Sequence, residues 1–454
     1  MSVLEVLEGV IKTETIGRVL VLGAGVSGVA AARLIQSHGG EALVCDESSA
    51  GIKADRAAVL KDCGAVYRGG GGDLPEGDFE FCVVSPSFAP EHRWLAECRR
   101  RRIPLISELE FGIRYWRGRI LAVTGSKGKS TLVKLCSDTL NLAGQKAVAG
   151  GNYGIPLCEL VLDASDAVWA VVEVSSFQME LSGNLAPDVA VLLNLQADHL
   201  DRHGTMEVYR SLKERLFAGQ GLGQMAILPQ GYREKYGWGA TSAQAVSFGT
   251  AGEWCYKKGF VVAPDGSEMR LAGTWFDNDI LGLAAAAGAA ALRACGVTVA
   301  DIERGWREFE PLRHRMELVG ESGGVVYIND SKATSLTALG AALVMAGRPV
   351  RLVAGGRLKE SNLTIVKELL TKHVKKVYLI GECADQMYDA WNSVVSCELC
   401  GTIDLAVTRA HAEAKAGEAV VLTPGTASFD QFKSYCERGE RFAAEVRRVA
   451  NLTR

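Results

Sequence analysis

Short apolar runs rich in β-branched residues alternate along almost the whole chain with stretches of helical periodicity. Most runs end at Gly, Asp or Ser, and helical patterning follows. Runs of this kind are typical of parallel strands buried on both faces and joined by crossover helices. The clearest predicted strands are residues 19–23, 42–46, 81–85, 120–125, 170–175, 189–195, 350–356, 376–381 and 419–425. The pattern predicts an α/β fold built on parallel, doubly wound sheets.

The chain is too long for one hydrophobic core, because its 454 residues exceed the usual size of a single domain. The order of the motifs described below divides it into three αβ units. We predict domain boundaries at residues 1–106, 107–312 and 313–454.

The composition is that of an ordinary globular protein and gives no sign of a nucleic-acid or membrane partner. The chain is 48% hydrophobic and 23% charged with a net charge of −3, which favours neither a nucleic-acid partner nor an anionic membrane surface. The longest nearly apolar run, residues 280–292, is mostly Ala and Gly and too short to span a bilayer, so it predicts a tightly packed helix. The first residues carry acids within their apolar stretch, unlike a secretory signal.

Twelve cysteines at irregular spacings indicate reduced thiols and a cytoplasmic protein. Cys397 and Cys400 form a C-x-x-C pair with no second pair at zinc spacing, so a structural role is favoured over a metal or redox role.

The segment TGSKGKST, residues 124–131, follows a predicted strand and opens a helical run. This is the context of a phosphate-binding loop, although Val123 stands where the full Walker pattern has glycine. Lys129 would reach the β- and γ-phosphates of ATP, and the Ser130 hydroxyl would bind Mg²⁺. The alternative is a glycine-rich turn with a surface lysine. The predicted ATP-binding residues of the loop are Gly125, Ser126, Lys127, Gly128, Lys129, Ser130 and Thr131.

A second glycine motif, G-x-G-x-x-G at Gly23, Gly25 and Gly28, follows the first predicted strand, and Asp46 ends the next strand. The motif predicts a Rossmann-like turn that faces a phosphate-bearing ligand. Tight packing of helix on strand without a ligand, or an NAD site, would also fit the motif alone.

Acidic and histidine residues stand at predicted strand ends in the same unit as the phosphate loop. They are Glu173, Asp198 and His199. Beside a phosphate loop, carboxylates can complete the ligand shell of Mg²⁺, although each residue alone could equally be a cap or a loop contact.

The third unit holds RHRMELV at 313–319 and YINDSKATS at 327–335. Asp330, Ser331 and Lys332 offer an acceptor, a small donor and a cation at a strand end, and a helix cap is the alternative.

Taken in order, TGSKGKST, EVSSFQ, N-x-x-x-D-H-L-D-R, H-R-x-E, DSKAT and TPGTASFDQFKSYCERG resemble the Mur ligase family over nearly the whole chain. The shortened phosphate loop is the form that this family uses. DSKAT followed by S-x-D-Q-F-x-x-Y resembles the branch that adds D-glutamate to UDP-N-acetylmuramoyl-L-alanine.

This resemblance implies three domains: a Rossmann-like N-terminal domain that binds the UDP substrate, a central phosphate-loop domain that binds ATP, and a Rossmann-like C-terminal domain that binds the amino acid. It implies that ATP activates the alanyl carboxylate as an acyl phosphate, which the amine of glutamate then attacks. ADP and phosphate are released. The expected cofactors are ATP and two Mg²⁺ ions, and the expected state is a cytoplasmic monomer without nucleic-acid or membrane partners.

The resemblance also implies individual roles. The catalytic residues would be Lys129, Glu173, His199, Lys213 and Lys332, with Ser130, Glu173, His199 and a carbamylated Lys213 as metal ligands. The UDP substrate would contact Val26, Ser27, Asp46, Ser85, Asn152 and His199. Further ATP contacts would be Asn278, Arg315 and Asp330, and the amino acid would contact Lys332, Thr334, Lys359, Ser428 and Tyr435. The residue pattern by itself predicts Lys213 to be an ordinary surface lysine on a helix.

The chain departs from the family pattern at several of these places. The usual Asn of the loop is Lys127, the His before the adenine-contacting Asn is Asp277, and Arg357 and Leu358 replace an Asp-Gly pair. Two alternatives stay open: a ligase that adds L-glutamate or another amino acid, and a non-catalytic UDP-sugar sensor. A polyglutamate ligase would not explain the N-terminal glycine motif, and a dehydrogenase would leave the ATP loop unexplained.

Overall fold

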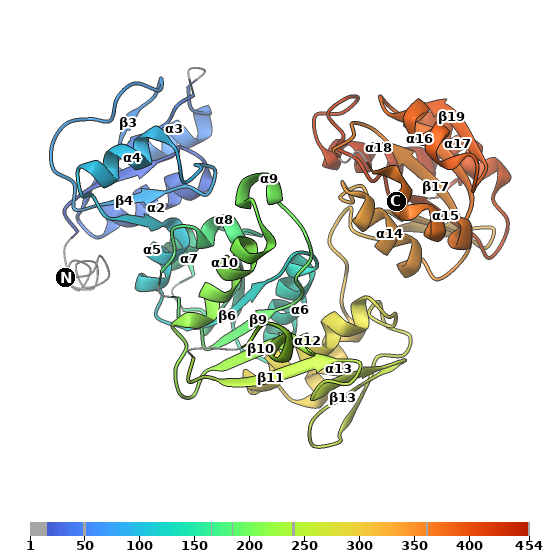
Figure 1. Cartoon of the computed structure of the whole chain (residues 1–454), viewed down its shortest axis with the longest axis horizontal. Helices are drawn as coiled ribbons and strands as arrows, with labels where there is room; N and C mark the ends of the chain where they lie inside the picture. Colours follow the sequence, from blue (N-terminus) through green and yellow to red (C-terminus); the bar gives the residue numbers. More distant parts are fainter. Residues whose placement is uncertain are drawn as a thin grey trace. The chain divides into compact units, whose positions relative to one another are not determined.

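The computed structural model describes residues 16–48, 51–164, 166–183, 185–237, 241–359 and 362–452 (Figure 1). Their strands form three sheets with helices packed on both faces, so the predicted α/β class is confirmed. The chain divides into two compact units, one of residues 1–277 and 282–309 and the other of residues 278–281 and 310–454. Each unit is described separately.

The first sheet is parallel and has the strand order β3-β2-β1-β4-β5. Val19 and Val21 of β1 pack on one face with helices α2 and α3, while Leu20 and Leu22 pack on the other with α4. This alternation explains why the strand is apolar throughout. The elements are β1 (Arg18–Leu22), α2 (Val26–Ser37), β2 (Glu41–Cys45), α3 (Ala54–Asp62), β3 (Val66–Arg68), β4 (Phe81–Val84), α4 (Arg93–Arg100), β5 (Leu105–Ser107) and α5 (Glu108–Tyr115).

The second sheet has the order β14-β13-β12-β11-β10-β9-β6-β8-β7 and is parallel from β7 to β12. β13 and β14 extend it as antiparallel strands, which the sequence pattern did not predict. Its strands are β6 (Arg119–Thr124), β7 (Ala147–Gly151), β8 (Trp169–Glu173), β9 (Val189–Leu192), β10 (Met225–Pro229), β11 (Gln244–Gly249), β12 (Trp254–Lys257), β13 (Phe260–Val262) and β14 (Glu268–Arg270).

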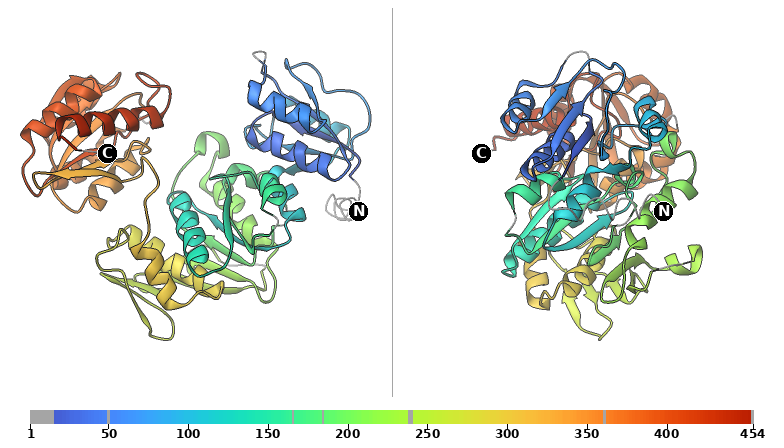
Figure 2. Two further views of the ribbon diagram at one scale, coloured as in Figure 1. Left: turned by 180° about the vertical axis from the view of Figure 1, so that it is seen from behind. Right: turned by 90° about the vertical axis from the view of Figure 1, so that its left-hand side faces the viewer.

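Helices α6, α12 and α13 pack together in this part of the chain (Figure 2). The buried alanines of α12, among them Ala285, Ala287 and Ala291, confirm the predicted packed helix. No helix in the described residues is long and apolar enough to cross a membrane. The helices are α6 (Lys129–Leu142), α7 (Leu157–Asp163), α8 (Ser176–Met179), α9 (Leu200–His203), α10 (Met206–Ala218), α11 (Tyr232–Tyr236), α12 (Leu281–Ala294) and α13 (Val299–Arg307).

The third sheet belongs to the second compact unit and has the order β15-β16-β20-β17-β18-β19. Only the β15–β16 pair in this sheet is antiparallel among the described strands. The carboxyl ends of β16, β20 and β17 therefore lie side by side, and their loops meet at one edge. The strands are β15 (Glu317–Ser322), β16 (Val325–Asn329), β17 (Val350–Gly355), β18 (Val374–Ile380), β19 (Cys397–Gly401) and β20 (Ala419–Leu422).

Helices cover both faces of this third sheet (Figure 1). One face carries α14 (Leu336–Met345), the 3₁₀ turn η1 (Leu363–Val366), α15 (Lys367–His373) and α16 (Ala384–Trp391), and the other carries α17 (Ile403–Glu413) and α18 (Tyr435–Val449). Cys397 and Cys400 lie on β19 as free thiols, and the structural role of that pair stays a prediction. All nine predicted strands are strands of the three sheets.

A buried ion pair stabilises the third sheet at the amino-terminal ends of β17 and β20, opposite the edge where the loops after β16, β17 and β20 meet. Arg351 of β17 donates from Nε to Glu418 Oε2 over 2.7 Å, and the two side chains are 10% and 12% exposed. Arg351 also donates to the Tyr378 hydroxyl. Removing one member of such a pair leaves the other charge buried without its partner.

We expect Arg351→Met to lower the free energy of unfolding by about 3–5 kcal/mol, because Glu418 would then be a buried carboxylate without its cation. The matched control is Arg441→Met on α18, whose ion pair with Asp404 is 56% and 40% exposed and should contribute no more than about 1 kcal/mol. Urea unfolding of both variants measures the difference. Equal losses in the two variants would contradict the ranking by burial.

Candidate active site

The phosphate loop connects β6 to α6, as the sequence predicted. Gly128 has φ +83°, a backbone conformation that favours glycine, and it sits at the N-cap of α6. The loop thus ends at the positive end of a long helix, where backbone N–H groups can bind a phosphate. Lys129 donates from Nζ to the loop carbonyls of Gly125 and Ser126, over 2.9 and 3.2 Å.

Asn194, which follows β9, holds this loop. Its Oδ1 accepts the N–H groups of Ser126 and Lys127 over 3.0 and 2.9 Å, and its Nδ2 donates to the Lys127 carbonyl over 2.9 Å. The Ser126 hydroxyl donates to the Gln196 carbonyl and accepts from the Tyr209 hydroxyl over 3.1 Å. The loop conformation is therefore fixed from the neighbouring strand.

Glu173, the last residue of β8, connects the phosphate loop to the next loop along the sheet. Its Oε2 accepts the Ser130 hydroxyl over 2.6 Å, and its Oε1 accepts the amide of Asn152 over 2.7 Å. The carboxylate is buried. Three residues predicted separately, one in the ATP loop, one as a metal ligand and one in the substrate site, thus form a single hydrogen-bonded chain.

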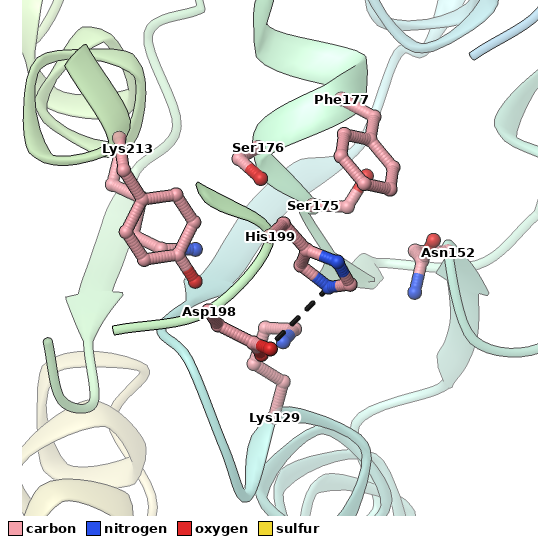
Figure 3. Close-up of a pocket in the computed structure, with 9 residues that line it drawn as sticks. Lys129, Asn152, Ser175, Ser176, Phe177, Asp198, His199 and Lys213 are labelled. Carbon is pink, nitrogen blue, oxygen red and sulfur yellow. Dashed lines mark ion pairs between the residues drawn. The ribbon is translucent and has the colours of Figure 1, made fainter. Parts of the chain in front are cut away.

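A pocket of about 90 Å³ opens at the carboxyl ends of these strands (Figure 3). His199 and Asn152 lie on one side of it, and Lys213 lies opposite, with Lys129 below. The pocket is lined by Lys129, Asn152, Ser175, Ser176, Phe177, Asp198, His199, Tyr209 and Lys213.

Lys213 is not the surface lysine that the residue pattern predicted. It lies on the inner face of α10, is 1% exposed, and donates from Nζ to the Gly125 carbonyl over 3.0 Å. The pKa of its ammonium is lowered to about 7, mainly by burial and also by the charge of Lys129, while Asp198 and Glu173 act in the opposite direction. The prediction failed because helical periodicity did not reveal that α10 packs its lysine against the loop.

Lys127, the departure in the loop, has a carboxylate partner. Its Nζ lies 3.0 Å from Asp198 Oδ2, and the same oxygen lies 3.7 Å from Nε2 of His199. Burial lowers the pKa of His199, Asp198 opposes that shift, and Lys127 adds to it. A neutral imidazole at this place can bind a metal through a ring nitrogen.

These donors fit a magnesium site of the predicted kind. Mg²⁺ takes few protein oxygens and completes its shell with water and phosphate. The Ser130 hydroxyl and the Glu173 carboxylate lie within hydrogen-bond distance of each other, as two ligands of one cation would. Among the residues that the structure describes, no three His, Cys, Asp or Glu side chains form a protein-only metal cluster.

The N-terminal glycine motif forms the turn between β1 and α2. A Cβ on Gly28 would meet the Gly23 carbonyl oxygen at 1.8 Å, so the third glycine permits close packing of helix on turn. Asp46 accepts the Ala24 N–H over 2.7 Å and so fixes the turn from the end of β2. The Ser85 hydroxyl is buried beside Gly23 and makes no hydrogen bond within the described chain. Val26 is exposed and Ser27 is half-buried.

In the second compact unit, Lys332 lies with Nζ 3.9 Å from the ring centroid of Tyr435. Asp330 is buried, accepts the Met316 N–H and the Thr423 hydroxyl, and burial raises its pKa to about 7. Thr334 and Arg315 are half-buried, Ser428 is buried and Lys359 is exposed.

Asn278 also belongs to this unit, and its Oδ1 accepts the N–H groups of Ile280 and Leu281 at the start of α12. The roles predicted for these residues stay predictions.

Several residues of the site were not predicted from the sequence: Asn194, Tyr209, and the pocket residues Ser175, Ser176 and Phe177 of the EVSSFQ motif. Asn194 stands in the N-x-x-x-D-H motif just after a predicted strand, so its position was a usable signal. Tyr209 lies on the same helix as Lys213 and gave no local signal, because its role depends on packing against Ser126.

Two family models match the chain: the Mur ligase middle domain over residues 123–281, and the Mur ligase glutamate ligase domain over residues 314–426. A relative from Acidobacterium capsulatum, named UDP-N-acetylmuramoylalanine–D-glutamate ligase, is 36% identical over 94% of this chain and 95% of its own length. A relative of the same name from Koribacter versatilis is 35% identical over 95% of this chain and 98% of its own length.

The chain belongs to the Mur ligase family. The resemblance drawn from the motifs is thereby confirmed, and with it the expectation of an ATP-dependent ligase.

Solved Mur ligases share the fold. The UDP-N-acetylmuramate–alanine ligase of Thermotoga maritima matches with a TM-score of 0.61 at 14% identity, covering 95% of this chain and 99% of that structure. A MurF ligase of Thermotoga maritima, solved in complex with ADP, matches with a TM-score of 0.60 at 18% identity, covering 90% and 95%.

We expect Lys129→Ala to lower kcat by about 100-fold or more without unfolding the protein, because it removes the cation that faces the phosphates. Lys134→Ala on the same helix is the matched control, since Lys134 pairs with Asp138 and does not line the pocket. Turnover and thermal unfolding of both variants provide the test. Normal turnover in Lys129→Ala would refute the assignment of the phosphate loop.

Proposed function

We propose that this chain is the ligase that adds D-glutamate to UDP-N-acetylmuramoyl-L-alanine with ATP, an early step of peptidoglycan precursor synthesis. The pocket at the carboxyl ends of the central strands carries this proposal, because Lys129 and Lys213 line it beside the phosphate loop. Glu173 bonds both Ser130 of that loop and Asn152 of the pocket. The names of the two relatives above support the choice of acceptor and amino acid.

The reaction requires two transfers. A carboxylate oxygen of the alanyl group attacks the γ-phosphorus of ATP, and ADP leaves with the electrons of the broken bond. The amine of D-glutamate then attacks the acyl carbon, loses a proton, and expels phosphate as the amide forms. The protein forms no covalent bond in this scheme, so its contribution is to position the reactants and to neutralise charge.

Lys129 and the N-terminus of α6 neutralise the phosphate charge, and Asn194 keeps the loop in shape for them. Ser130 and Glu173 would hold the first Mg²⁺ ion, and His199 with Lys213 would hold the second. Mg²⁺ supplies charge neutralisation on the phosphoryl oxygens when bound.

Lys127 does not argue for a decayed enzyme. The ion pair with Asp198 compensates the extra charge beside the loop. Lys129, His199 and Lys213 line the pocket, and Glu173 bonds Asn152 at its wall. A non-catalytic sensor would have no need of this set.

We further propose that Lys213 is carbamylated. A fully buried ammonium whose hydrogen bond goes to one carbonyl is costly, whereas a carbamate at the same place would present oxygens to a cation. Carbon dioxide reacts with the neutral amine, which the packing around Lys213 favours. The resulting side chain would serve as a carboxylate ligand.

Labelling with ¹³C-bicarbonate tests this step. We expect a protein-bound carbamate resonance that disappears in Lys213→Met and weakens as the pH falls below about 7, because protonation removes the reactive amine. Lys134→Met is the control and should keep the resonance. A spectrum that is the same for wild type and Lys213→Met would contradict carbamylation at this residue.

The remaining assignments follow the family pattern. The β1–α2 turn with Asp46 and Ser85 would hold the UDP group, and Asn152 the muramoyl part. Asn278, Arg315 and Asp330 would contact ATP, and Lys332, Thr334, Lys359, Ser428 and Tyr435 the amino acid. The three sheets support a division into three domains, although the proposed boundary at residue 106 falls within β5 (Leu105–Ser107) of the first sheet. We propose a cytoplasmic location, since ATP is a cytoplasmic substrate, and keep the monomer that the family resemblance implies.

Phosphate release from Mg-ATP and UDP-N-acetylmuramoyl-L-alanine should depend on D-glutamate. Parallel reactions with D-glutamate, L-glutamate and no amino acid make the comparison. Release that prefers L-glutamate would keep the mechanism and change the substrate. Absence of release with either amino acid would contradict the proposed ligase and favour the sensor.

A further inference from the structure

Arg438 on α18 is buried in the second compact unit, with 1% of its surface exposed. Its Nε donates to Ser331 Oγ over 3.0 Å, and Nη2 donates to the carbonyls of Ser331 and Thr426 over 2.9 and 3.1 Å. Its Nη1 lies 3.3 Å from the Ala427 carbonyl and 3.5 Å from that of Gly355. One guanidinium thus contacts three separate segments of backbone.

Those segments are the loops at the carboxyl ends of adjacent strands. Ser331 follows β16, Gly355 ends β17, and Thr426 and Ala427 follow β20. The same loops carry residues proposed for the amino acid: Lys332 and Thr334 on the first, Lys359 on the second, and Ser428 on the third. Arg357 and Ala427 also exchange backbone hydrogen bonds, so the second and third loops are joined directly.

Ser331 connects Arg438 to Tyr435, the remaining residue proposed to contact the amino acid. Its hydroxyl accepts from Arg438 and donates to the Tyr435 carbonyl over 2.8 Å at the start of α18. The Tyr435 ring in turn lies against Nζ of Lys332. Arg438 therefore touches each loop of the proposed amino-acid site, although it was not among the residues predicted from the sequence.

The positive charge of Arg438 is buried without a hydrogen bond to a carboxylate among the described residues. Within the described chain, its hydrogen-bond acceptors are all neutral oxygens, and Asp430 acts on it only through its charge. Burial lowers its pKa to about 10, which still leaves it protonated at neutral pH. A buried cation whose hydrogen bonds reach no carboxylate attracts anions to its surroundings.

We propose that Arg438 is the positioning residue of the amino-acid site: it holds the three loops that carry the binding residues and adds positive charge for a dicarboxylic substrate. This inference rests on the proposed function, since it concerns where that substrate binds. A planar guanidinium can contact three loops at once, and a lysine ammonium at the same position cannot.

Steady-state kinetics of Arg438→Lys test the proposal. We expect KM for D-glutamate to rise by roughly tenfold or more, because small displacements of binding groups are costly. KM for the UDP substrate should stay within about twofold, since all of its proposed contacts lie in the first unit. KM for ATP is a weaker comparison, because the proposed ATP contact Asp330 adjoins Ser331, which Arg438 holds. Arg441→Met on the same helix is the control and should leave all three values unchanged.

Ser331→Ala is the second variant, and it tests the positioning role of Arg438 if Arg438→Lys does not fold. It removes the hydroxyl between Arg438 and Tyr435, and KM for D-glutamate should rise by between about twofold and tenfold. An unchanged KM for D-glutamate in a folded variant, or an equal rise in all three KM values, would overturn the positioning role. Wild-type protein that shows no D-glutamate-dependent release would instead overturn the proposed function, so the two failures are distinguishable.

Discussion

The side-chain amide of Asn194 is the contact on which the candidate active site depends. It bonds the loop after β6 in both directions, as an acceptor for two N–H groups and a donor to one carbonyl. Because β6 and β9 are neighbours in the sheet, a residue just past β9 can reach that loop. With the loop fixed, Ser130 meets Glu173, Glu173 meets Asn152, and Lys213 closes the opposite wall against the Gly125 carbonyl.

The sequence alone predicted those features whose residues lie close together along the chain. A strand, a glycine-rich loop and a helix follow each other directly at residues 119–142, and the loop residues could be identified without knowing the fold. Glu173 and His199 were selected by position, since Glu173 ends β8 and His199 stands in the loop after β9, two parallel strands of one sheet. The alanine-rich helix α12 was predicted from its local composition, because a run of Ala and Gly is typical of a closely packed helix.

The sequence alone did not predict the role of a side chain whose surroundings come from residues far away along the chain. Lys213 was predicted at the surface because it stands in an ordinary helical pattern, and its burial depends on the loop 88 residues earlier. Arg438 stands in the quoted C-terminal motif TPGTASFDQFKSYCERG, but it was not named as a site residue. Motif reading selects groups that would face a ligand, whereas Arg438 faces carbonyls. The antiparallel strands β13 and β14 are short and carry no long apolar run, so the pattern that found the parallel strands missed them.

The central claim is that ATP activates the alanyl carboxylate before the amide forms. An acceptor labelled with oxygen-18 in that carboxylate tests it directly, because one carboxylate oxygen becomes the bridge to phosphorus in the acyl phosphate. Mass spectrometry of the phosphate released in the presence of D-glutamate gives the result. The account predicts that each phosphate carries one labelled oxygen from the acceptor, and release of unlabelled phosphate together with amide product would contradict it.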